Sequence, residues 1–190
     1  MGKIPDKMFT AKEAADCGLP RWRLAQMVDT GELERVSRGV YMKSGANGST
    51  MPEVEVLVAR GTDFVVALES ALRIHEFSTA TPHELWIAMR RGARTPKVDF
   101  PLKIVRVDDR SFDMGAEWRN VQGVRARVYS PAKTVADLFK FRNKIGMERA
   151  LEALKDGLRR RLFTVDELLK CAKVDRVFRI IVPYIEGYFG

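Results

Sequence analysis

The sequence predicts an α+β protein with an N-terminal winged helix-turn-helix, followed by a mixed α/β domain with a small sheet and a helical C-terminal tail. Three observations support this fold class. Two helical patterns and a hairpin pattern follow one another over residues 10–43, β-rich runs lie between residues 84 and 130, and helical periodicity dominates from residue 130 onward. The 190 residues suffice for one small and one medium domain.

The first part of this prediction rests on helix start and stop signals. Thr10 is followed three residues later by Glu13, the spacing of a capping box, and Gly18 can end the helix in the left-handed conformation. Pro20 suits the first turn of a second helix, which Gly31 closes. These residues predict two short helices separated by a tight turn.

The second helix has two different faces, and a hairpin follows it. The residues expected on its apolar face are Pro20, Leu24, Met27 and Val28. Trp22 and Gln26 then point the other way. The alternating runs LERV and GVYMK, joined by Ser37, Arg38 and Gly39, predict a β-hairpin. Helix, turn, helix and hairpin is the order of a winged helix-turn-helix.

Arginine and glutamine side chains begin the second helix, and further cations accompany the hairpin. In a helix-turn-helix the second helix lies in the major groove, where arginine and glutamine can pair with guanine and adenine. Cations of the hairpin would meet phosphates or the minor groove. The candidate DNA-binding residues are Arg21, Trp22, Arg23, Gln26, Arg35, Arg38 and Lys43. Two alternatives stay open: these charges only solvate a small domain, or Trp22 packs against the second domain or a dimer partner.

A turn-rich stretch separates this head from the rest of the chain. Residues 44–50 are small and polar, which is typical of a linker, and they divide the chain into domains at residues 1–45 and 50–190. Downstream, PEVEVLVAR and ALESALRIHEF have helical spacing. The runs ELWIAM, PLKIVRV and VRARVYS predict three or four strands joined by hairpins or loops, and helices starting at Ser130 and Thr164 follow.

Positive charge is also dense in the second domain, with few acids between the cations. The candidate residues for a second basic face are Arg90, Arg91, Arg94, Lys97, Arg106, Arg125 and Arg127. Alternation along residues 102–107 does not place every charge on one side of a strand, so part of this set could be a solvated sheet surface. The face would meet flanking DNA, RNA or an acidic partner protein, and the sequence does not choose among them.

The familiar catalytic motifs are missing from the sequence. It contains no P-loop, dinucleotide-binding, nucleophile-elbow or zinc-protease motif, so we expect no catalytic residue, cofactor or metal. His75 lies in an apolar helix, as a hydrogen-bonded structural imidazole would. A buried salt bridge to an arginine would explain Asp137. One acidic cluster could hold a metal in a nuclease, but its composition is typical of a solvated loop; it comprises Asp108, Asp109, Asp113 and Glu117.

Composition limits the setting of the protein. The net charge of +8 favours nucleic acid as a partner. No apolar run approaches the ~20 residues needed to cross a bilayer, and the first residues lack the apolar stretch of a signal peptide, so we expect a cytoplasmic protein without a membrane partner. Cys17 and Cys171 are far apart, which predicts two buried thiols and neither a zinc site nor a disulfide.

Three segments together resemble the AbiEi antitoxin family of type IV toxin-antitoxin (abortive infection) systems. They are FTAKEAADCGLPRWRLAQMVDTGELERVSRGVYMK, ALESALRIHEF and VYSPAKTVADLFKFR, so the resemblance extends over nearly the whole chain. It implies a non-enzymatic antitoxin of phage defence, whose winged head represses its own promoter by binding inverted repeats. Its C-terminal domain would counter a nucleotidyltransferase-like toxin. On this resemblance the DNA contacts fall on Arg21, Trp22, Arg23, Gln26, Arg35 and Arg38.

Several properties stay open beside this resemblance. The toxin partner need not be bound directly, and no short motif assigns the antitoxic role to particular residues after Thr50. We expect a monomer that binds DNA cooperatively, although the sequence leaves the oligomeric state undecided. Two other classes of function compete: a nuclease or nucleic-acid-modifying enzyme that uses the basic body and the acidic cluster, and a transcription regulator that responds to a small ligand.

Overall fold

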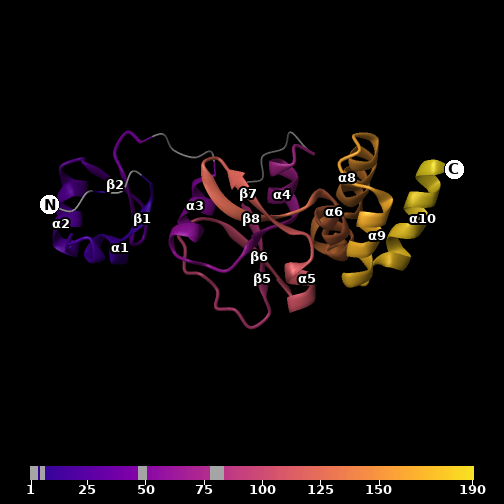
Figure 1. Ribbon diagram of the computed structural model, residues 1–190, viewed down its shortest axis with the longest axis horizontal. Coiled ribbons are helices and arrows are strands. Elements are labelled where there is room, and N and C mark those ends of the chain that lie inside the picture. Colours follow the sequence, from indigo (N-terminus) through magenta and orange to yellow (C-terminus); the bar gives the residue numbers. More distant parts are fainter. Residues whose placement is uncertain (1–3, 5–6, 47–50, 78–83) are drawn as a thin grey trace. The chain divides into compact units, whose positions relative to one another are not determined.

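A computed structural model describes residues 4, 7–46, 51–77 and 84–190 of the chain (Figure 1). Contacts between residues divide it into two compact units. The first, called the head unit, comprises residues 1–63, 94–100 and 120–125, and the second, called the body unit, comprises residues 64–93, 101–119 and 126–190. The linker expected at residues 44–50 lies mostly outside the described residues, and the domain boundary placed there stays a prediction.

The N-terminal part of the head unit contains the predicted succession of two helices and a hairpin (Figure 1). Within the described residues the three-stranded sheet has the order β1-β3-β2, and β3 runs antiparallel to both neighbours. The short strand β1 was not expected from the sequence. The elements of the head unit are β1 (Phe9–Thr10), α1 (Ala11–Asp16), α2 (Arg21–Asp29), β2 (Leu33–Ser37), β3 (Val40–Lys43) and α3 (Pro52–Ala59).

The predicted signals at the ends of α1 and α2 are confirmed. The Thr10 hydroxyl accepts a hydrogen bond from the backbone N–H of Glu13 at 3.2 Å, and the Glu13 carboxylate accepts one from the backbone N–H of Thr10 at 2.7 Å. This is a complete capping box. Gly18 and Gly31 have φ angles of 80° and 76°, which residues with a side chain rarely adopt.

The apolar face of α2 anchors this helix in the core of the head. Leu24 and Met27 are buried with Phe9, Ala14 and Leu33. The prediction that Pro20 shares this face is wrong, since Pro20 is exposed. The helix begins at Arg21, so Pro20 is its N-cap residue and precedes the helical positions.

The body unit begins with a mixed sheet and ends in helices. Within the described residues the sheet has five strands in the order β6-β5-β4-β8-β7. Its first elements are β4 (Val65–Val66), α4 (Leu68–Ile74), β5 (Leu85–Arg90), β6 (Leu102–Val107), α5 (Asp109–Asp113), β7 (Ala116–Val121) and β8 (Val124–Tyr129). The helices that follow are α6 (Pro131–Lys140), α7 (Arg142–Ile145), α8 (Met147–Arg159), α9 (Val165–Val174) and α10 (Phe178–Phe189).

Hairpins or loops were expected between the strands, and the structure adds parallel pairings that the sequence did not predict. Strands β5 and β6 are parallel, in a register that pairs Leu85 with Leu102, and β4 is parallel to β8 but antiparallel to β5. Two of the five strands were not predicted from the sequence. Strand β4 is only two residues long and buried on both sides, whereas β7 has a run of exposed residues and therefore lacks the alternation that marks a half-buried strand.

Helix α6 forms the centre of the helical part of the body unit. It contacts α8, α9, α4 and α10, and Figure 1 shows α6, α8, α9 and α10 grouped at the C-terminal side of this unit. All residues from Ala132 to Phe139 are buried. Ser130 accepts a hydrogen bond from the backbone N–H of Lys133 and caps α6, and Thr164 forms a second capping box with Glu167 at the start of α9.

A cluster of charged side chains lies inside this helical core. The Lys133 ammonium lies 2.5 Å from Oδ1 of Asp137 and 3.0 Å from Oδ2 of Asp175. Lys140 reaches the other oxygen of Asp175 at 2.8 Å, and Ser111 donates a hydrogen bond to that oxygen at 2.6 Å. The sequence had suggested an arginine as the partner of Asp137. The partner is instead a lysine one helical turn earlier, because residues four apart face each other on a helix.

Burial and the neighbouring opposite charges shift the pKa values of this cluster in opposite directions. Complete burial raises the pKa of Asp137 to about 7, since the attraction of Lys133 does not offset the lost hydration. Oδ2 of Asp137 accordingly has no hydrogen-bond partner within the described part of the chain. Burial alone would raise the pKa of Asp175, but Lys133 and Lys140 outweigh it, so this pKa is lowered. Burial likewise opposes the charge of Lys133, yet the two carboxylates raise its pKa.

Replacing Lys133 with alanine is expected to destabilise the body unit strongly. At about pH 8 the change leaves two buried carboxylates without their shared cation, which costs about 3–5 kcal/mol for a broken buried pair. Urea unfolding followed by circular dichroism measures the loss. Lys155→Ala, at an exposed position of α8, serves as control and should change stability by less than about 0.5 kcal/mol. Equal unfolding midpoints for Lys133→Ala and the control would contradict the role of the cluster.

Asp137→Asn is expected to change how stability depends on pH. Because the pKa of Asp137 is about 7 in the folded protein and 3.8 ordinarily, only the folded state holds this proton between these values. The stability of the wild type should therefore fall relative to the variant as the pH rises through this window, by at most about 1.4 kcal/mol per pH unit. Urea unfolding at several pH values tests this trend, and a constant difference between the two proteins would refute it.

Candidate nucleic-acid interface

The outer face of α2 presents the polar side chains that the sequence singled out. Trp22 is 67% exposed, Arg21 and Gln26 are exposed, and Arg23 is half-buried. Trp22 and Gln26 are four residues apart and therefore lie on the same side of the helix. Leu24 occupies the opposite, buried side. The helix thus has an aromatic ring and an amide on one side, and two guanidinium groups in its first turn.

The charge distribution of α2 suits an anionic ligand. Its first turn contains no acidic residue, and the N-cap Pro20 makes no side-chain hydrogen bond to the helix. The positive end of the helix dipole and the cation Arg21 therefore lie at the same place. Asp29, its acidic residue, lies at the opposite end. Phosphate is attracted to such a helix start.

The hairpin supplies further cations beside this helix. Arg35 is exposed on β2, and Arg38 is exposed in the turn between β2 and β3. Lys43 is the last residue of β3. It is half-buried, and its side chain or backbone interacts with another group of the protein. The pairing of β2 with β3 is irregular between Arg35 and Ser37, which is typical of a β-bulge.

The hairpin turn is held in place by two residues that sequence reasoning missed. The Asp99 carboxylate accepts hydrogen bonds from the Ser37 hydroxyl at 2.5 Å and from the backbone N–H of Arg38 at 3.2 Å. The Arg60 guanidinium donates to the Arg38 carbonyl at 2.6 Å and to the Lys97 carbonyl. The hydrogen bond from Ser37 is the main reason why the pKa of Asp99 is lowered. No local pattern could have revealed contacts over such sequence distances.

The cations expected to form a second basic face fall into two groups. Those of the body unit are Arg90, Arg91, Arg106 and Arg127, and those of the head unit are Arg94, Lys97 and Arg125. Arg90 forms ion pairs of 2.8 Å with both Asp109 and Asp113 and lies over the Phe112 ring. Arg127 lies over the same ring, and Arg106 donates to the Ala93 carbonyl at 2.6 Å. These contacts hold local structure, and a continuous second face stays a prediction.

The four acidic side chains expected to form a cluster make local structural contacts. Asp108 caps α5 by accepting a hydrogen bond from the backbone N–H of Ser111 at 3.0 Å, and this bond lowers its pKa. Asp109 and Asp113 bind Arg90, and Glu117 pairs with Arg119 at 3.0 Å. Among the residues that the structure describes, no group of three histidine, cysteine or acidic side chains could hold a metal ion.

His75 and the two cysteines do not form a reactive group either. His75 is buried, with Nε2 2.6 Å from the Tyr129 carbonyl, and burial lowers its pKa, so the neutral ring donates this hydrogen bond. His83 lies outside the described residues. Cys171 is buried as expected, and burial raises the pKa of its thiol to about 11. Cys17 is exposed, contrary to expectation, because it follows the last turn of α1 on the outer side of the head.

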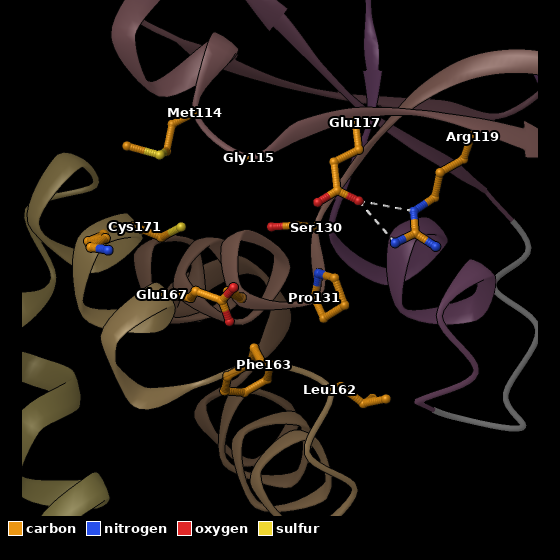
Figure 2. A pocket seen from close by; sticks show the side chains of 12 residues that line it. Met114, Gly115, Glu117, Arg119, Ser130, Pro131, Leu162, Phe163, Glu167 and Cys171 are labelled. Atoms are coloured by element: carbon orange, nitrogen blue, oxygen red, sulfur yellow. Dashed lines mark hydrogen bonds and ion pairs between the residues drawn. The ribbon is translucent and has the colours of Figure 1, made fainter.

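The body unit contains a cleft of about 320 Å³ (Figure 2). Apolar side chains, among them Met114, Leu162 and Phe163, line much of it, and the ion pair of Glu117 and Arg119 lies at one side. The hydroxyl of Ser130 lies in the lining, where it caps α6. A regulator that responds to a small ligand would use such a cleft.

No helix among the described residues has the length and apolar character needed to cross a membrane.

Trp22→Ala is expected to leave the stability of the head nearly unchanged, whereas Leu24→Ala should lower it. Trp22 is 67% exposed and Leu24 is fully buried, so only the second change opens a cavity in the core. The expected cost is about 2–5 kcal/mol for Leu24→Ala and less than about 0.5 kcal/mol for Trp22→Ala. Urea unfolding of the two variants measures the difference, and a large loss for Trp22→Ala would show that the ring is a packing residue.

Comparison with known proteins bears on this same segment. Residues 6–42 match a family model described as a transcriptional regulator, AbiEi antitoxin. The match includes α1, α2 and the β2–β3 hairpin up to Met42, so it contains the candidate residues from Arg21 to Arg38. No curated protein sequence matches the chain. The resemblance inferred from the sequence is thereby confirmed over this part of the head unit: residues 6–42 of this chain are similar to the AbiEi antitoxins, a family of transcriptional regulators.

Proposed function

We propose that this protein is an antitoxin that represses transcription by binding duplex DNA through a winged helix-turn-helix in its head unit. The observation that carries the proposal is the outer face of α2. Arg21, Trp22 and Gln26 are exposed there while Leu24 and Met27 fix the opposite face in the core. An amphipathic helix held in this way can enter the major groove with its N-terminal half.

The residues would divide the work between base recognition and phosphate binding. Arg21, Arg23 and Gln26 have the chemistry to read base edges, because a guanidinium pairs with guanine and an amide with adenine. Trp22 would contact a thymine methyl group or a sugar beside them. Cations of the hairpin would bind phosphates, which adds affinity without sequence preference and weakens binding in salt. They are Arg35, Arg38 and Lys43.

We propose a biological setting like that of the family that residues 6–42 resemble. As a type IV antitoxin, the protein would bind inverted repeats in its own promoter and oppose a nucleotidyltransferase-like toxin in the cytoplasm, without acting as an enzyme. The family match supports the regulator and antitoxin assignment. The antitoxic role would belong to the part of the chain after Thr50. We propose that the protein binds the promoter as a cooperating monomer.

Changes on α2 and in the hairpin should affect DNA binding differently. Arg23→Ala or Gln26→Ala should cost about 1–3 kcal/mol on the promoter and relax base preference, because each removes a contact to a base edge. Arg38→Ala should weaken all duplexes alike and reduce the slope of log affinity against log salt by about 1. Gel shifts and fluorescence anisotropy at several salt concentrations measure both effects, with exposed Lys155→Ala as control.

Two outcomes would refute the proposal. If the wild type does not bind its own promoter at moderate salt, the DNA-binding half fails. If expression of the full chain does not relieve the growth arrest caused by a nucleotidyltransferase-like toxin from the same genome, the antitoxin half fails. The two halves of the proposal are tested independently. The DNA-binding assay contains no toxin, and the growth assay does not require the promoter.

A further inference from the structure

We infer that the segment 94–97 extends the phosphate-binding surface of the hairpin, and that Asp99 and Arg60 are positioning residues that hold it there. We call the four residues Ser37, Arg38, Asp99 and Arg60 the wing clamp. This inference rests on the proposed DNA-binding function and adds to it a second segment, far along the chain from the winged head. All the residues concerned belong to the head unit.

Both carboxylate oxygens of Asp99 accept hydrogen bonds from the hairpin turn. Oδ1 accepts the hydroxyl hydrogen of Ser37 at 2.5 Å, and Oδ2 accepts the backbone N–H of Arg38 at 3.2 Å. Ser37 is buried although it stands next to the turn. Two hydrogen bonds from adjacent residues to one carboxylate fix its orientation. The hairpin turn is therefore attached to the 94–100 segment and is not a free tip.

Arg60 joins the same two segments from the other side. One terminal nitrogen of its guanidinium donates to the Arg38 carbonyl at 2.6 Å and to the Ser37 hydroxyl at 3.2 Å. The second terminal nitrogen donates to the Lys97 carbonyl. Both nitrogens belong to one planar group. The backbones of Arg38 and Lys97, 59 positions apart in the sequence, are thus held at one guanidinium.

The clamp uses one positive and one negative charge, and the two segments that it joins carry exposed cations. Asp99 and Arg60 are occupied with main-chain and hydroxyl groups of the clamp. Arg38, Arg94 and Lys97 are exposed, and no acid occurs within residues 94–98. The segment attached to the hairpin turn therefore adds two exposed cations, Arg94 and Lys97, to Arg38 of the turn. A duplex phosphate backbone is the partner that complements exposed cations in the same unit as a candidate recognition helix.

The double variant Arg94→Ala/Lys97→Ala in the full-length chain tests this surface. If both cations bind phosphates, affinity should fall about tenfold at moderate salt, as for two exposed charge contacts. The loss should be equal on the promoter and on unrelated duplexes, and the salt slope should decrease by about 2. A matched control is Lys144→Ala/Lys155→Ala, which removes two exposed cations of the body unit. Equal affinity and slope for the test and control variants would overturn the inference.

Asp99→Ala separates positioning from plain electrostatics. Removing an acid next to bound DNA should tighten binding if only charge matters. If Asp99 positions the segment, the same change should weaken binding several-fold, and the Arg94→Ala/Lys97→Ala pair should then cost less than it does in the wild type. Asp99→Asn, which keeps an acceptor for Ser37, should restore part of the affinity. Circular dichroism confirms that each variant is folded, and tighter binding by Asp99→Ala would overturn the positioning role.

These outcomes can be told apart from failure of the proposed function. If Arg23→Ala and Gln26→Ala reduce promoter preference while Arg94→Ala/Lys97→Ala changes nothing, the extended surface is wrong and the winged head stands. If the wild type binds no duplex at all, the proposed function itself fails. Loss of binding to RNA or to an acidic protein, with duplex binding intact in the double variant, would assign the segment to another partner and overturn the inference.

Discussion

The burial of Leu24 and Met27 is the constraint on which the candidate interface depends. Because these two side chains fix one face of α2 in the core of the head, the helix cannot rotate, and Trp22 and Gln26 must face outward. The helix has only nine residues and would be marginal alone. Packing of one face therefore both forms the helix and decides which side chains a partner can meet.

The head and the body use charged side chains in different ways. In the head, the carboxylate and guanidinium of the wing clamp bind main-chain groups of a turn near the surface, so charge serves to fix a loop. In the body, Lys133 joins carboxylates of α6 and α9 inside an apolar core, where water cannot compensate a missing partner. The first arrangement attaches the hairpin turn to the 94–100 segment. The second makes the helical packing specific and costly to disturb.

Charge density in the sequence did not by itself define a second basic face. The body-unit cations Arg90, Arg106 and Arg127 are engaged in local contacts. Arg94 and Lys97, from the same run of positive charge, lie in the head unit. A linear run of arginines thus contains structural residues and candidate DNA contacts side by side, and burial and pairing distinguish them.

The sequence alone determined the local features: the capping boxes at Thr10 and Thr164, the glycine ends of α1 and α2, the hairpin, and the outward face of α2, because each depends on residues within a few positions of one another. Only the tertiary structure decided the strand order and parallel pairings of the sheet, the lysine partner of Asp137, and the wing clamp. These features join segments whose proximity is set by packing of the whole unit, and neither hydrophobic periodicity nor turn chemistry carries information about contacts at such distances along the chain.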